Sequence, residues 1–373
     1  MVRHFLPDPV MDNPSYNFAA GPGVMPAAVL EQAQKEFLNW NKSGMSLLET
    51  PFSGASFKKL FQEVRDNLRQ LLAIPDDYQI LFMHGGASAQ FSLVPLNLLG
   101  KHVKADYVET GYWSAKTMRE AGRYCQVRVA ASSADTGFDS MPNTWQIAPQ
   151  TAYCHITSNE TANGVQFHHD PDTGDIPLIA DMTSDFLSRP VEISRYGLIY
   201  AGAQKNIGPA GLTVVIVRKD LLGHAHAATP SVFNYCLQAE ADSMLNTPLT
   251  FAVYLAGLVF RWIESQGGLE MMAQNSFRRS ARLYQVIDDN NDFYCCRVQP
   301  AHRSYMNVCF NLVNEALTEK FLAEAEISGL HHLKGHPMVG GIRASIYNAM
   351  PDEGVEALML FMRHFAENYR SYV

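Results

Sequence analysis

The stretch YAGAQKNIGPAGLTVVIVRKDLL, residues 200–222, places one lysine, Lys205, among small and turn-forming residues. An apolar run at residues 176–181 precedes it, and another, residues 212–217, lies inside it. Glycine and proline mark turns, so residues 204–209 predict a tight turn between two strands. Lysine is rarely buried without a partner, which leaves two interpretations. It is either an exposed loop lysine or an amine kept partly dry so that it can form a Schiff base.

The size and composition of the chain are typical of a soluble enzyme. With 373 residues it exceeds the usual size of one compact domain, which predicts a large domain and a smaller one. Hydrophobic residues make up 47% and charged residues 18%, as in a well-packed protein rather than a disordered one. The formal net charge of −8 argues against a general nucleic-acid binder.

The cysteines and the amino terminus indicate a reducing compartment. Six cysteines are too few for a disulfide scaffold and lack CxxC metal spacing, so we expect reduced thiols, no metal site and a cytoplasmic protein. They are Cys125, Cys154, Cys236, Cys295, Cys296 and Cys309. The first residues include prolines and acids where a signal peptide needs an apolar run. No stretch approaches the roughly 20 apolar residues that span a bilayer, so we expect no membrane partner.

Helical and strand-like patterns alternate along the first two thirds of the chain. Apolar residues at helical spacing predict helices, and short apolar runs predict strands. These patterns predict helices at residues 27–41, 57–72 and 90–99, and strands at residues 79–83, 152–156, 176–181 and 198–201. The later strands are far enough apart for crossovers, so the order favours an α/β fold with a mainly parallel sheet covered on both faces.

The character of the sequence changes from about residue 266. A helix, a strand and a second helix are predicted in that order, at residues 270–290, 306–312 and 315–328. This order is typical of a smaller α+β domain. We therefore predict a large domain at residues 16–265 and a small domain at residues 266–373. We expect the segment 1–30 to pack with the small domain.

A second chemical signal is the sequence HGGAS at residues 84–88, between a predicted strand and a predicted helix. Glycines at a helix start leave backbone N–H groups free beside the positive end of the helix dipole, which suits a phosphate. The segment matches neither GxGxxG nor the P-loop pattern. A phosphate cup and an ordinary tight turn both stay open from this motif alone.

Asp181 closes an apolar strand at the end where α/β sheets usually bind ligands. It is either a capping aspartate or the partner of a cationic ring nitrogen. One strand and its crossover are enough to bring Asp181 and Lys205 to the same sheet edge. An anion cup, a buried acid and a turn lysine together are what pyridoxal 5′-phosphate requires for its phosphate, its ring nitrogen and its imine.

Two longer stretches carry a family resemblance. DMTSDFLSRPVEISRYGLIYAGAQKNIGPAGLTVVIVRKDLL, residues 181–222, and GGIRASIYNAM, residues 340–350, resemble the phosphoserine aminotransferases of the class V group. The match runs from NFAAGP, residues 17–22, to NAMP, residues 348–351. The resemblance implies a fold-type I pyridoxal phosphate enzyme, whose large domain holds a mainly parallel seven-stranded sheet between helices. It also implies that Lys205 is the Schiff-base lysine.

The resemblance further implies a cofactor site shared by the two subunits of a homodimer. Trp113 is similar to the residue that stacks on the pyridine ring, Thr161 to the hydroxyl that bonds its phenolic oxygen, and Asp181 to the acid at the ring nitrogen. For the cofactor phosphate, the implied residues are Ala87, Ser88 and Gln204 of one subunit and Asn246 and Thr247 of its neighbour. Without the resemblance, a lone tryptophan is more often a core residue, and Asn-Thr-Pro reads as a helix start.

The chain departs from the family pattern where the substrate's phosphate would bind. Phe52 and Ser53 stand where the family has a His-Arg pair, and Pro337 follows His336 where it has an arginine. Arg343, which resembles the clamp for the substrate's carboxylate, is kept. A phosphate dianion in a pocket partly shielded from water needs charged hydrogen-bond donors. These replacements therefore disfavour binding of a phosphorylated substrate. The nearby basic residues that would compensate are Lys334, Lys42 and His331.

The implied reaction is transamination from L-glutamate to 3-phosphooxypyruvate. Its implied catalytic residues are Lys205 and Asp181, and its substrate-binding residues are Arg343, His336, Phe52 and Ser53. The altered pocket leaves an alternative, the same reaction on an unphosphorylated 2-oxo acid. A lyase or cysteine desulfurase is a further alternative, but no cysteine lies in a Ser/Gly-rich loop and Trp113 replaces a stacking histidine. A non-catalytic binding protein would be expected to lack the lysine or the acid.

Overall fold

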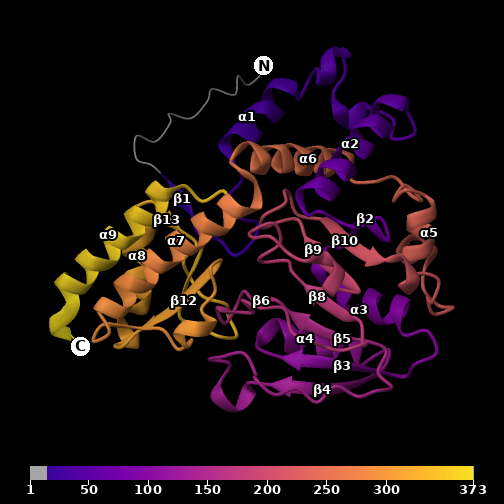
Figure 1. Ribbon diagram of the computed structural model, residues 1–373. Coiled ribbons are helices and arrows are strands. Elements are labelled where there is room, and N and C mark those ends of the chain that lie inside the picture. Colours follow the sequence, from indigo (N-terminus) through magenta and orange to yellow (C-terminus); the bar gives the residue numbers. More distant parts are fainter. Residues whose placement is uncertain (1–14, 373) are drawn as a thin grey trace, which may run out of the picture.

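The computed structural model describes residues 15–372, and its centre is a seven-stranded sheet (Figure 1). The strand order is β2-β10-β9-β8-β5-β3-β4. Neighbouring strands are parallel except at β10, which is antiparallel to both β2 and β9. The strands are β2 (Tyr78–His84), β3 (Lys104–Glu109), β4 (Gln126–Ser132), β5 (Cys154–Thr157), β8 (Leu178–Asp181), β9 (Leu198–Gly202) and β10 (Leu212–Arg218). The predicted α/β fold with a mainly parallel sheet is confirmed.

Successive side chains of these strands point to opposite faces of the sheet, and each face carries its own hydrophobic core. On β10, Val214 and Ile216 belong to one core, and Val215 and Val217 belong to the other. The first face is covered by α1 (Ala27–Glu36), α2 (Ala55–Leu71) and α6 (Thr250–Ser265). The second is covered by α3 (Gly86–Leu98), α4 (Tyr112–Ala121) and α5 (Tyr235–Glu240). Strands buried on both faces form continuous apolar runs, which the sequence shows clearly.

The carboxy-terminal part of the chain forms a three-stranded antiparallel sheet of order β11-β12-β14. A third hydrophobic core joins this sheet to its helices. Figure 1 shows this part in orange and yellow beside the large sheet. Its elements are α7 (Gly268–Asp289), β11 (Tyr294–Cys295), β12 (Asn307–Leu312), α8 (Thr318–Ile327), β14 (Ile342–Ser345) and α9 (Asp352–Tyr369). No helix within residues 15–372 has both the length and the apolar character needed to cross a membrane.

The first described residues pair with the carboxy-terminal part. β1 (Tyr16–Asn17) runs parallel to β13 (Leu330–His331), whereas α1 belongs to the core of the large sheet. Residues 1–14, part of the segment predicted to pack with the small domain, lie outside the described residues. The domain limits 16–265 and 266–373 stay predictions.

Three details differ from the sequence-based prediction. The helix predicted for residues 27–41 ends at Glu36 and is followed by a separate 3-10 turn in which Asn41 is left-handed. No α-helix connects β5 to β8 or β8 to β9 in the described chain. A hairpin of β6 (Asn159–Glu160) and β7 (Val165–Gln166) lies in the first connection, and a 3-10 turn (Ile193–Arg195) lies in the second. The prediction also lacks the β3-α4-β4 unit, whose edge strand β4 is largely exposed.

Candidate active site

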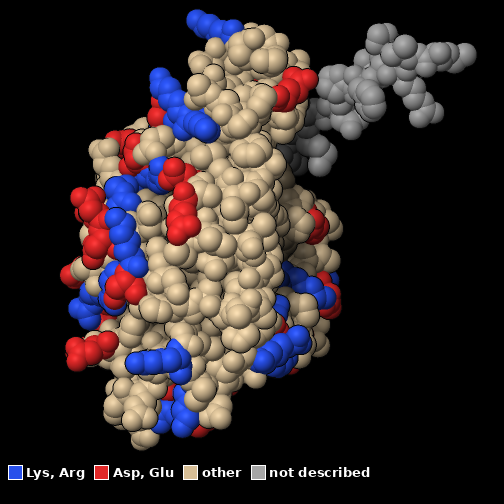
Figure 2. All heavy atoms as spheres, turned by 90° about the vertical axis from the view of Figure 1, so that its right-hand side faces the viewer, with Lys and Arg blue, Asp and Glu red and all other residues tan. Residues whose placement is uncertain are grey.

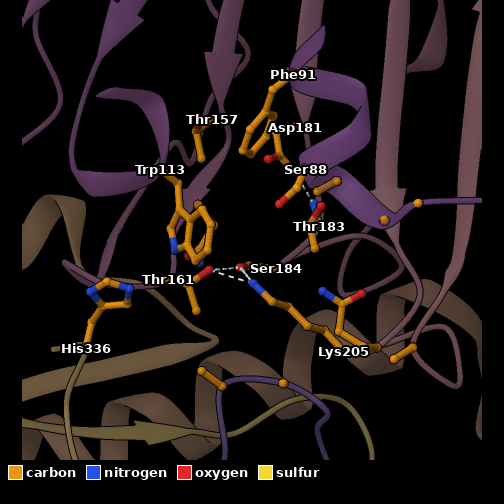
Figure 3. Close-up of a pocket in the computed structure, with 18 of the residues that line it drawn as sticks. Ser88, Phe91, Trp113, Thr157, Thr161, Asp181, Thr183, Ser184, Lys205 and His336 are labelled. Carbon is orange, nitrogen blue, oxygen red and sulfur yellow. Dashed lines mark hydrogen bonds between the residues drawn. The ribbon is translucent and has the colours of Figure 1, made fainter. Parts of the chain in front are cut away.

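A cavity of about 630 Å³ opens where the carboxyl ends of the central strands meet the small sheet. The turn after β2, the ends of β5 and β8, the turn between β9 and β10, and β14 all line it. Figure 3 shows labelled side chains around the cavity, among them Ser88, Asp181 and Lys205. The predicted site residues that it brings together are Ala87, Ser88, Trp113, Thr161, Asp181, Gln204, Lys205, His336 and Arg343.

Lys205 lies in the turn between β9 and β10 and points into the cavity (Figure 3). Its Nζ donates hydrogen bonds to Thr161 Oγ1 and to Ser184 Oγ, both at 2.6 Å. Burial lowers the pKa of the Lys205 amine to about 8, although Asp181 acts in the opposite direction. The exposed-loop interpretation is therefore wrong. Ser184 is absent from the predicted site, although its place just after Asp181 at a strand end is a usable signal.

Asp181 is the last residue of β8, and its buried carboxylate faces the same cavity. Its Oδ1 accepts a hydrogen bond from the backbone N–H of Thr183 at 2.9 Å. Burial raises the pKa of Asp181, while the bonds from Thr183 and the nearby Lys205 lower it. No ion pair with this carboxylate forms within residues 15–372. A buried carboxylate without an ion pair suits a ligand that carries a positive charge, such as the protonated ring nitrogen of pyridoxal phosphate.

The glycine turn after β2 has the backbone shape of an anion cup. Gly85 and Gly86 have φ angles of 101° and 65°, a region that residues with side chains rarely adopt. A Cβ on Gly85 would also lie 2.6 Å from the Cβ of Ala89. The turn leads into α3, so the amino end of this helix, with Ala87 and Ser88, faces the cavity. Its free N–H groups and helix dipole favour a phosphate, so a tight turn and a phosphate cup are compatible here.

A buried acid fixes the first turn of α4 beside the cavity. Glu160 accepts hydrogen bonds from the N–H groups of Trp113 at 3.0 Å and Ser114 at 2.8 Å. Gly111 precedes the helix, and a Cβ there would lie 2.7 Å from the carboxyl carbon of Glu160. These contacts hold the Trp113 ring on the cavity wall, where its Nε1–H has no hydrogen-bond partner among the described residues. Glu160 is absent from the predicted site because no local pattern links it to the distant α4.

Two further side chains on the cavity wall correspond to the predicted substrate contacts. Arg343 lies on β14, and its buried Nε–H has no hydrogen-bond partner in the part of the chain that is described. His336 packs on Tyr112 with ring centroids 4.1 Å apart, and its Nδ1 accepts a bond from the N–H of Met338 at 3.2 Å. Burial, followed by the positive charges of Arg343 and Lys116, lowers the pKa of His336. Both effects disfavour the charged form of the imidazole.

Four predicted site residues do not line this cavity. Phe52 and Ser53 line a separate depression beside α2. Asn246 and Thr247 follow α5 in a loop and also lie outside the cavity wall of their own chain. The resemblance assigns these residues to contacts across a dimer, so a single chain does not test them.

The basic residues expected to compensate for the missing arginines lie away from the cavity of their own chain. Lys334 Nζ bonds Glu319 at 3.0 Å, and His331 Nδ1 bonds Glu326 at 2.6 Å. Lys42 lies in a 3-10 turn and does not line the cavity. Within residues 15–372, Arg343 is thus the one arginine on the cavity wall.

Known proteins are similar in sequence to this chain over nearly its whole length. The family model described as aminotransferase class-V matches residues 15–358. The chain is 52% identical over 361 residues to the phosphoserine aminotransferase of Acidithiobacillus ferrooxidans, an alignment that covers 96% of this chain and 100% of the relative. It is also 52% identical over 357 residues to that of Chromobacterium violaceum, with 95% and 99% covered.

Solved structures agree with the sequence relatives. Phosphoserine aminotransferase from Bacillus circulans subsp. alkalophilus superposes with a TM-score of 0.93 at 44% identity, covering 95% of this chain and 99% of that one. The pyridoxal phosphate-bound phosphoserine aminotransferase of Trichomonas vaginalis gives a TM-score of 0.90 at 39% identity, covering 94% and 100%. Both superpositions span the large and the small sheet of the present chain.

The chain therefore belongs to the class-V aminotransferase family and, within it, to the phosphoserine aminotransferase group. It is a transaminase that depends on pyridoxal 5′-phosphate, so the predicted enzyme class and cofactor are confirmed. The lyase, desulfurase and non-catalytic interpretations are excluded. The glycine turn, the buried acid and the cavity lysine fit the phosphate, the ring nitrogen and the aldehyde of this cofactor.

Proposed function

We propose that this transaminase interconverts O-phospho-L-serine and 3-phosphooxypyruvate in the cytoplasm, with 2-oxoglutarate and L-glutamate as the second pair. The observation that carries the proposal is the 52% identity over nearly the whole chain to a phosphoserine aminotransferase. The test is product analysis after incubation of the purified protein with phosphoserine and 2-oxoglutarate. We expect glutamate and 3-phosphooxypyruvate in equal amounts, and the absence of both would contradict the proposal.

Different cavity residues would hold different parts of the cofactor. Pyridoxal 5′-phosphate, when bound, supplies an electron sink that acidifies the α-carbon of the substrate. The N–H groups at the start of α3, with Ser88 and Gln204, would hold its phosphate. Asp181 would face the ring nitrogen, where a buried carboxylate keeps a proton in place. Trp113 would pack on the ring and exclude water from that side.

Lys205 and Arg343 act on the substrate. Because the pKa of the Lys205 amine is lowered to about 8, part of it is the neutral base near neutral pH. The neutral amine would take the proton from the substrate's α-carbon and then, as the ammonium, deliver it to the cofactor carbon that bears the aldehyde. Arg343 would bind the α-carboxylate through paired N–H donors, one of which is the Nε–H that lacks a partner in the described chain.

We also propose that the enzyme is a homodimer with shared active sites. Asn246 and Thr247 do not line the cavity of their own chain. The exposed side chains of Leu48 and Leu245 adjoin the two segments expected to cross the dimer. Figure 2 shows the face that carries α5 at the right of Figure 1, with a broad central area free of charged side chains. Areas of this kind mark protein–protein interfaces.

Subunit mixing tests the shared site. Lys205→Ala protein and an Asn246→Ala/Thr247→Ala double variant should each be inactive or weak alone. A mixed dimer has one intact site, because Lys205 of one subunit meets Asn246 and Thr247 of the other. Random mixing should therefore restore about a quarter of the wild-type activity.

The matched control mixes Lys205→Ala with Lys205→Arg protein, which should restore nothing because neither subunit supplies the lysine. Native mass spectrometry establishes that mixed dimers have formed. Mixed dimers without recovered activity would place Asn246 and Thr247 at the site of their own chain.

One observation favours a second candidate, transamination of an unphosphorylated 2-oxo acid. Phe52, Ser53 and Pro337 offer no positive charge, and Lys334 and His331 are bonded to acidic side chains. Arg343 alone neutralises a carboxylate but leaves a phosphate dianion without a second cation. The ratio of kcat/KM for phosphoserine and for unphosphorylated amino acids separates the two candidates.

A further inference from the structure

Two hydroxyl groups bind the amine of Lys205, and only one of them, Thr161, belongs to the predicted site. The other is Ser184, in the loop after β8. Lys205 Nζ lies 2.6 Å from each hydroxyl oxygen, and the two hydroxyls also hydrogen-bond each other. Figure 3 shows these three groups as a closed triangle at the side of the cavity.

The loop that carries Ser184 is anchored on both sides. The carbonyl oxygen of Ser184 accepts a hydrogen bond from Asn206 Nδ2 at 3.2 Å, and Asn206 directly follows Lys205 in the chain. The next residue, Asp185, is buried and accepts hydrogen bonds from Ser158 Oγ and from Gln166 Nε2. These bonds fix the backbone on which the Ser184 side chain stands, so the position of its hydroxyl is set before any ligand binds.

The donor count around the amine leaves one position of Nζ without a partner. An ammonium has three N–H donors, and no partner besides Thr161 and Ser184 is found for Lys205 Nζ in residues 15–372. The third tetrahedral position of Nζ is therefore free. The nearby Tyr347 hydroxyl has partners of its own: it donates to the carbonyl of Ala20 at 2.7 Å and accepts from Asn307 Nδ2 at 3.3 Å.

We propose that Ser184 is a positioning residue for Lys205: together with Thr161 it binds two N–H groups of the amine and turns the third position of Nζ toward the cavity. In the neutral amine that third position is the lone pair, which is the base of the reaction. The role of the lone pair as base rests on the proposed function, whereas its orientation by Ser184 does not.

Removal of the Ser184 hydroxyl has two consequences. A hydroxyl that accepts from the ammonium stabilises the charged form more than the neutral one, so its loss should lower the pKa of Lys205 by about one unit. Loss of one anchor also frees rotation about the Cε–Nζ bond among three staggered positions, so the fraction of correctly oriented lone pairs should fall by up to about threefold. The other charged groups around the amine are unchanged; they are Asp181, Asp185, Glu160 and Arg343.

The test is competitive labelling of the full-length protein after removal of the cofactor. Trace acetic anhydride reacts with neutral amines, and peptide mass analysis at a series of pH values gives the midpoint and the plateau rate for Lys205. For Ser184→Ala we expect the midpoint to move to lower pH by about one unit and the plateau rate to fall by up to about threefold. In the holoenzyme, at a pH where the amine is neutral in both proteins, kcat should fall by up to about threefold with little change in KM.

Three further variants separate positioning from a structural role. Ser184→Thr keeps the hydroxyl and should restore the wild-type midpoint, whereas Ser184→Cys keeps the volume and should behave like Ser184→Ala. Ser188→Ala removes a hydroxyl whose one hydrogen bond within residues 15–372 is to the carbonyl of Asp185, so it should leave the labelling curve unchanged. A wild-type curve for both Ser184→Ala and Ser184→Cys would overturn the proposal. The labelling uses no substrate. If phosphoserine fails to react, the proposed function is wrong, but the labelling result for Ser184 is unaffected.

Discussion

Replacement of Lys205 by alanine should lower kcat by at least about 10⁴-fold, since the variant loses both the covalent attachment of the cofactor and the base for proton transfer. The variant should still bind pyridoxal phosphate non-covalently, because the glycine turn and Asp181 are intact. Borohydride treatment of the wild-type holoenzyme followed by peptide mapping should place the reduced cofactor on Lys205. Stopped-flow absorbance in the visible region measures the loss of turnover.

Lys219→Ala is the matched control, because Lys219 is an exposed lysine just beyond β10. It should retain wild-type kcat and the same borohydride-labelled peptide. Label on any lysine other than Lys205 would contradict the assigned role, and so would substantial turnover by the Lys205→Ala variant.

Arg343→Ala should lower kcat/KM by about 10²- to 10⁴-fold for every amino-acid substrate, because two charge-assisted hydrogen bonds to the α-carboxylate are each worth roughly 1.5–3 kcal/mol. The loss should be similar for phosphoserine and for glutamate, which share only the α-amino acid group. The measurement is the rate of each half-reaction at limiting substrate concentration.

Two control variants test whether the effect is specific to the guanidinium group of Arg343. Arg343→Lys keeps the charge but not the paired geometry, so it should recover only part of the loss. Arg363→Ala removes an exposed arginine on α9 and should have no effect. A loss confined to phosphoserine would instead assign Arg343 to the substrate's phosphate.

The candidate site could be predicted from the sequence because its two main residues lie at the ends of buried strands. Asp181 ends β8 and Lys205 follows β9, and both strands are apolar runs with clear boundaries. The direction of β10 could not be predicted in this way. A strand buried on both faces has the same apolar pattern whether it runs parallel or antiparallel to its neighbours.

Residues that act through distant contacts have no such local signal. Glu160 holds the first turn of α4 from a separate segment of the chain. The edge strand β4 carries polar side chains, so no apolar run marks it. Contacts from a second subunit, as expected for Asn246 and Thr247, depend on a surface that a single sequence does not define.

The most direct test of the proposed function is kcat/KM for phosphoserine beside serine, alanine and other unphosphorylated amino acids, each with 2-oxoglutarate as acceptor. If a second subunit or a moved side chain supplies the cation that Phe52, Ser53 and Pro337 lack, phosphoserine gains at least one charged hydrogen bond over serine. We therefore expect phosphoserine to exceed serine by about tenfold or more. A higher kcat/KM for any unphosphorylated amino acid would contradict phosphoserine as the substrate and support the second candidate.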